Sequence, residues 1–234
     1  MSRASTVWAM TTPSSVPVPA PAEVRNAGIV LIATTLLAIV MMAHHPTAGS
    51  HDSAELAKQI SENAMLSRVV HGVLIALIVI QLYVFLLFSE WIRASRGIAR
   101  FGLFAYAFGA IAMTGAALIS GFLVSDLAVH YADMPAEHTT AFADLALFAM
   151  TGNQVLAKLG VLAMSAGILA WAIALVRARE TRWLAIVGLF ASLAPAVALL
   201  LGAIRLDVRG MMIVVLCQAA WNVAAGIFLI RSKS

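Results

Sequence analysis

Six long runs of apolar residues dominate the chain, and short polar stretches separate them. The runs occupy residues 27–43, 69–89, 101–125, 155–176, 183–204 and 210–230. Because a helix rises about 1.5 Å per residue, each run can cross a hydrocarbon layer about 30 Å thick, the first only just. We therefore predict an all-α, polytopic membrane protein with six transmembrane helices in one bundle.

Two of the polar connections carry helical signals of their own. Between Asp52 and Met65, Asp52 and Glu55 have the spacing of a capping box. Leu56, Ile60 and Ala64 then repeat at helical spacing. Residues 139–150 also have a helical pattern, and residues 151–153 (Thr-Gly-Asn) predict a break before the fourth span. We expect short extracytoplasmic helices that lie on the outer end of the bundle or extend its spans.

The first 24 residues differ from the rest of the chain. Four prolines fall between residues 13 and 21, among Ser, Thr and Val. This composition is typical of a disordered, partly extended segment. We predict a disordered cytoplasmic N-terminal arm over residues 1–24 and a transmembrane domain over residues 25–234.

Composition and charge agree with a membrane protein and indicate its orientation. The chain is 62% hydrophobic and 11% charged, too little charge to cover a soluble domain. Ten of its 15 Lys and Arg residues, but only three of its 11 Asp and Glu residues, lie on one side of the predicted spans. The positive-inside rule then places both termini in the cytoplasm. We expect a bacterial inner-membrane protein whose partners are the lipid bilayer and other membrane proteins or further copies of itself, not nucleic acid.

All six histidines fall on the predicted outer side. His44 and His45 end the first span and His71 begins the second, so antiparallel packing can bring them face to face. Asp126 and His130, four residues apart, would share one helical face near the next outer loop. Imidazole and carboxylate groups are ligands for zinc, copper and iron. The pattern suggests a metal site built from His44, His45, His71, Asp126 and His130.

The sequence is also compatible with several other functions. The same residues would suit an accessory or scaffold membrane protein with no cofactor, because polar side chains are ordinary at the wet ends of spans. Two histidines on facing helices could hold a haem, which ranks below a bare ion. A zinc-dependent membrane hydrolase is a further alternative, although the sequence contains neither HExxH nor GxSxG.

The span interiors give three further expectations. None has an Asp, Glu, Lys or Arg near its middle, which argues against a proton- or ion-coupled transporter. Gln218 and Asn222 are four residues apart in the sixth span, and we expect this face to hydrogen-bond to other helices. Gly109, Gly115 and Gly121 in the third span predict close helix packing.

Overall fold

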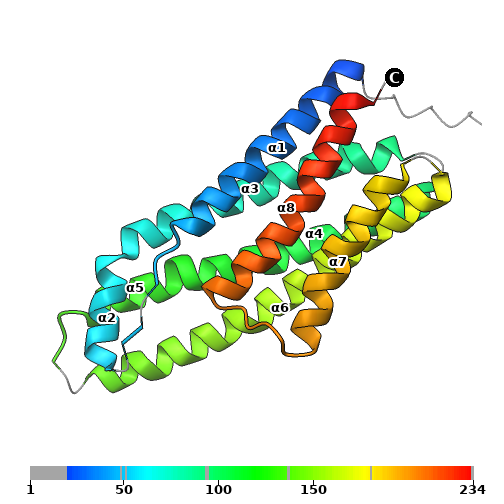
Figure 1. Cartoon of the computed structure of the whole chain (residues 1–234). Helices are drawn as coiled ribbons and strands as arrows, with labels where there is room; N and C mark the ends of the chain where they lie inside the picture. The colour runs from blue at the N-terminus through cyan, green and yellow to red at the C-terminus, as the bar shows by residue number, and fades with distance from the viewer. Residues whose placement is uncertain are drawn as a thin grey trace, which may run out of the picture.

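The computed structural model describes residues 20–47, 49–50, 52–92, 95–135, 138–179 and 181–232. These residues form helices and no strand. The elements, shown in Figure 1, are α1 (Pro21–Ala43), α2 (Ser53–Glu62), α3 (Ala64–Trp91), α4 (Arg96–Leu118), the π-turn η2 (Ile119–Leu123), α5 (Val124–Tyr131), α6 (Thr139–Ala178), α7 (Arg182–Leu200) and α8 (Val208–Arg231).

Six helical stretches are long and apolar enough to cross a membrane, as the sequence predicts. They are α1, α3, the continuous stretch from α4 to α5, most of α6, α7 and α8. The chain therefore has the architecture of a polytopic membrane protein. The assignment of the cytoplasmic side stays a prediction, as does the arm, of which residues 1–19 lie outside the described part of the chain.

Helix α1 begins earlier than the first apolar run. Pro21 takes the first helical position, where a missing N–H costs nothing, and the Glu23 carboxylate accepts a bond from the Ala20 N–H at 3.0 Å.

The predicted cap of α2 is confirmed, because Asp52 accepts a bond from the Glu55 N–H at 2.9 Å.

The predicted break at residues 151–153 is wrong. Helix α6 runs without interruption over 40 residues. The Thr151 hydroxyl donates to the Leu147 carbonyl at 2.8 Å, and the Asn153 amide donates across to the Ala116 carbonyl of α4 at 2.7 Å. One glycine in a helix costs only about 1 kcal/mol, and these two hydrogen bonds, one within α6 and one to α4, offset that cost.

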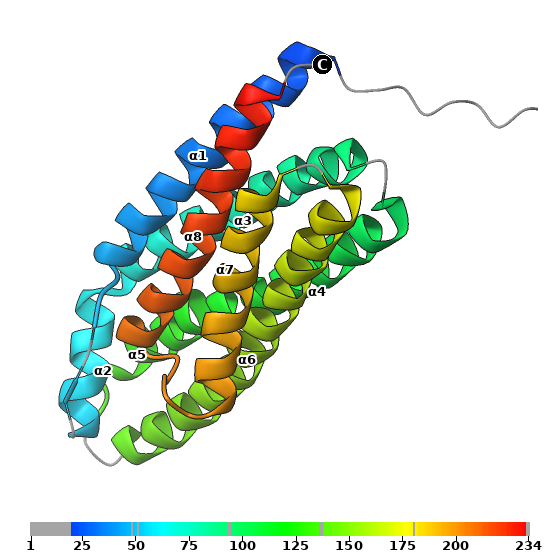
Figure 2. The same cartoon turned by 45° about the vertical axis from the view of Figure 1, so that its right-hand side comes forward.

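The two ends of the bundle differ. The start of α1 and the end of α8 lie side by side at one end, which we call the terminal end (Figures 1 and 2). Helices α2 and α5 and the loop after α1 lie at the opposite end, which we call the histidine end. This arrangement puts His45 and His71 at the same end, as the antiparallel packing of the first two spans predicts.

Aromatic side chains fill the terminal half of the bundle. Phe85, Phe88, Tyr106, Trp171 and Trp221 are each no more than 1% exposed. Trp171 stacks on Phe85 with a ring-centroid distance of 4.6 Å and on Trp221 at 6.4 Å. Its Nε1–H lies within hydrogen-bond distance of two acceptors, the Ser89 hydroxyl at 2.9 Å and the Ala99 carbonyl at 3.1 Å. The terminal half of the bundle is therefore a well-packed core.

Glycines bring α4 and α6 together along this core, as predicted for Gly109. A Cβ atom on Gly109 would lie 2.8 Å from the Gly160 carbonyl oxygen, and one on Gly167 would lie 2.7 Å from that of Gly102. Larger residues at these positions would push the two helices apart.

Candidate functional site

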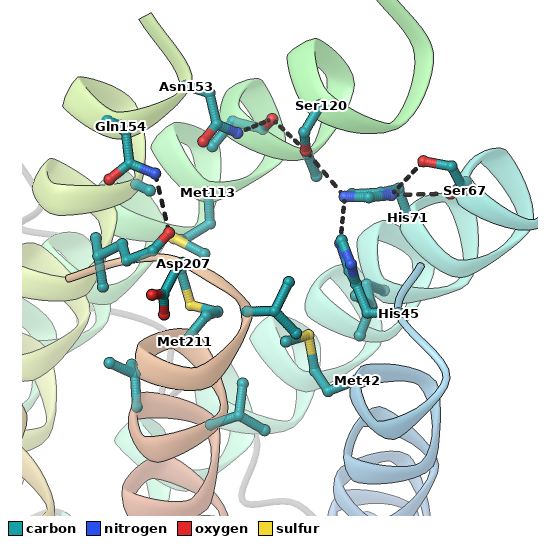
Figure 3. Close-up of a pocket in the computed structure, with 18 of the residues that line it drawn as sticks. Met42, His45, Ser67, His71, Met113, Ser120, Asn153, Gln154, Asp207 and Met211 are labelled. Carbon is teal, nitrogen blue, oxygen red and sulfur yellow. Dashed lines mark hydrogen bonds between the residues drawn. The ribbon is translucent and has the colours of Figure 1, made fainter. Parts of the chain in front are cut away.

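The histidine half of the bundle encloses a cavity of about 900 Å³ (Figure 3). The described residues that line it come from α1, α2, α3, α4, η2, α5, α6 and α8, together with the loops that precede α2 and α8. Its walls are mostly apolar, with Leu74, Met113 and Val214 among them. The aromatic core fills the terminal half, so the cavity lies between that core and the histidine end.

His45 and His71 meet on the wall of this cavity. His71 is 5% exposed and lies near the start of α3, whereas His45 follows the end of α1. The two Nε2 atoms are 3.2 Å apart, and the rings meet edge to face at 73°. The loop reaches back to α3 because α1 ends just before Pro46, whose ring cannot continue a helix.

Backbone carbonyls fix the tautomer of both rings. His71 Nδ1 lies 2.8 Å from the Ser67 carbonyl oxygen, and His45 Nδ1 lies 2.8 Å from that of Pro46. A carbonyl oxygen only accepts, so each Nδ1 carries the hydrogen and donates it. Both Nε2 atoms therefore carry lone pairs when the rings are neutral. Burial lowers the pKa of His45, which keeps that ring neutral at pH 7.

The lone pairs of two nitrogen atoms 3.2 Å apart repel each other, and few hydrogen-bond donors lie nearby. The Ser120 hydroxyl lies 2.9 Å from His71 Nε2 and can donate its single hydrogen there. The same hydroxyl is also 3.2 Å from the Ala116 carbonyl oxygen. Among the described residues, His45 Nε2 has the His71 ring as its hydrogen-bonding neighbour and no further donor. A cation between the two nitrogen atoms would remove this repulsion.

The π-turn η2 packs directly against the His71 ring. Ser120 and Gly121 both lie in this turn and both meet His71. A Cβ atom on Gly121 would lie only 2.4 Å from the Cβ and Cγ atoms of His71. The absence of a side chain at Gly121 therefore makes room for the imidazole, and π-turns of this kind recur at functional sites.

The structure brings together two of the five residues in the predicted metal site, His45 and His71. His44 is exposed, and its Nδ1 lies 2.9 Å from the Val40 carbonyl oxygen of its own helix. Asp126 forms an ion pair with Arg68, and exposed His130 packs against the Tyr131 ring. Over the part of the chain that the structure describes, no group of three or more His, Cys, Asp or Glu side chains could hold a metal ion.

Other polar residues also line the cavity, and their sequence patterns alone do not indicate a binding site. Asp207 caps α8 by accepting from the Gly210 N–H at 2.8 Å, and the Gln154 amide donates to the Leu206 carbonyl at 2.9 Å. The predicted hydrogen bonds from Gln218 and Asn222 to neighbouring helices are absent among the described residues. Both line the cavity, and neither side-chain amide has a hydrogen-bond partner among the described residues.

Comparisons with family models, with curated protein sequences and with solved structures found no significant match to this chain.

Proposed function

We propose that this integral membrane protein binds one transition-metal ion between His45 and His71, at the histidine end of its bundle. The observation that supports this proposal is the pair of Nε2 atoms only 3.2 Å apart, with each Nδ1–H held by a backbone carbonyl. Histidines that bind metals commonly donate their second N–H in this way, which fixes the tautomer and orients the lone pair.

The separation of the two nitrogen atoms suits an ion. For Nε2 atoms 3.2 Å apart, an ion about 2.05 Å from each would have an N–metal–N angle of about 103°. This angle is close to the tetrahedral value that zinc prefers. A haem with two axial histidines would need these nitrogen atoms about 4 Å apart on opposite faces of the porphyrin, which the present contact does not provide.

The ion would keep open coordination positions. Two imidazoles leave at least one position for water or a ligand, and this position would face the cavity. Imidazole nitrogen suits zinc, copper(II) and iron, and the thioether of Met42, which lines the same cavity, would suit copper(I) (Figure 3). Metal handling or sensing fits this arrangement better than hydrolysis, since no carboxylate completes a three-residue metal group with the pair among the described residues.

The test is a binding measurement on the full chain in detergent, after metal has been removed with a chelator. Equilibrium dialysis against Zn²⁺ and, separately, Cu²⁺ should give one saturable site in the wild type. His45→Ala and His71→Ala should each weaken that site about 10- to 100-fold.

The chain offers matched controls for this experiment. His44→Ala changes the neighbouring residue, and Asp126→Asn and His130→Ala change the other residues of the predicted set. All three should bind as the wild type does. If His45→Ala, His71→Ala and His44→Ala all bind equally, the proposal is wrong. The protein would then be better described as an accessory or scaffold membrane protein with no bound cofactor.

A further inference from the structure

The deep end of the cavity has a polar character that the histidine pair does not explain. Gln218 and Asn222 lie one helical turn apart on α8 and line the cavity near the middle of the bundle, 10 and 14 residues beyond the start of that helix at Val208. Thr35 and Gln81 line the cavity from α1 and α3. The Gln81 amide lies 3.5 Å from the Thr35 hydroxyl, at the limit of a hydrogen bond.

The two α8 amides lack protein partners within the described part of the chain. Asn222 is 4% exposed, and its Oδ1 is buried without a hydrogen-bond partner. Gln218 is half-buried and also makes no hydrogen bond to another described residue. Leaving a buried amide unpaired is costly, so such groups normally have a partner from the protein, from water or from a ligand.

The remaining walls limit what that ligand can be. The cavity between the amides and the histidine pair is lined by apolar side chains, including Leu77, Met113 and Val214. Among the described lining residues, only Asp207 and Arg209 are Asp, Glu, Lys or Arg, and both lie at the histidine end where α8 begins. A charged group would therefore have no counter-ion beside the amides.

We propose that the cavity binds a neutral amphipathic molecule, of the class of lipophilic alcohols and phenols, whose hydroxyl group pairs with the Gln218 and Asn222 amides. An amide can both donate to and accept from a hydroxyl group. A volume of about 900 Å³ is within the range of small-molecule sites, which are typically mostly apolar with a few polar groups that fix orientation. This inference does not depend on a metal ion at His45 and His71.

The test compares two probes that differ by one hydroxyl group, 4-nonylphenol and nonylbenzene. Their binding to the full chain in lipid nanodiscs is measured by calorimetric titration, with empty nanodiscs subtracted. For the phenol, Asn222→Leu and Gln218→Leu should each weaken binding about 2- to 10-fold, the equivalent of one net hydrogen bond. For nonylbenzene, both variants should bind at least as well as the wild type.

Two controls separate a cavity site from general effects on the bundle. Ser165→Ala removes a different buried polar group without a partner, the hydroxyl of a residue outside the described cavity lining, and should bind both probes normally. Ala117→Trp adds bulk on the α4 wall and should weaken both probes. Binding of the phenol that is unchanged in Asn222→Leu and Gln218→Leu would overturn the proposal, and water would then satisfy the amides. Failure of metal binding would leave these results unaffected.

Discussion

Gly121 offers a direct test of how the site is packed. In Gly121→Ala, the added methyl carbon would lie 2.4 Å from two carbons of His71, whereas ordinary contacts begin near 3.4 Å. His71 or the π-turn must therefore move by about 1 Å, and overpacking of this kind costs about 1–3 kcal/mol. The shift would also separate His71 from His45 and weaken metal binding about 10- to 100-fold.

Gly72 supplies the matched control on the neighbouring helix. A methyl group there would lie 3.8 Å from Phe122 Cζ, which is an ordinary contact. Replacing glycine by alanine reduces the flexibility of the unfolded chain in both variants, so their difference isolates the clash. Thermal unfolding in detergent should show Gly121→Ala about 2–12 °C less stable than Gly72→Ala. Equal melting temperatures, together with unchanged metal affinity, would refute this account of the packing.

Three further predictions concern the bundle itself. Trp171→Phe should lower the free energy of unfolding by about 1–3 kcal/mol, because it leaves the Ser89 hydroxyl and the Ala99 carbonyl without their donor. Trp183→Phe, at a half-exposed position, should change it little, and thermal unfolding distinguishes the two variants. Asp207→Ala should destabilise the protein by about 0.5–2 kcal/mol through the lost cap of α8, and Asp207→Asn should retain most of the stability in the same assay. A C-terminal fusion to green fluorescent protein should fluoresce and one to alkaline phosphatase should be inactive, since we expect the C-terminus in the cytoplasm.

The helices could be predicted from sequence because the apolar runs are long and the polar stretches between them are distinct. The cap at Asp52 was equally readable, since its spacing to Glu55 is a local signal. The expected break at residues 151–153 failed for a physical reason. Glycine lowers helix propensity only slightly, and the hydrogen bond from Asn153 to α4 is a tertiary contact that no local pattern contains.

The candidate site was predictable only in part. Adjacent antiparallel spans predict that His45 and His71 share one end of the bundle, and they do. The contacts of His71 with Ser120 and Gly121 depend on a π-turn, which has no sequence signature in this stretch. The spacing of Gln218 and Asn222 marks a polar face. Whether that face meets a helix or a cavity depends on how the side chains of the surrounding helices fill space.

Electron paramagnetic resonance of the Cu²⁺-loaded protein would test the central claim most directly, because the spectrum reports how many nitrogen atoms bind the ion. The wild type and His44→Ala should both show two equivalent imidazole nitrogens at one copper per chain. His45→Ala should show one. A wild-type spectrum that matches that of His45→Ala would contradict a metal site between His45 and His71.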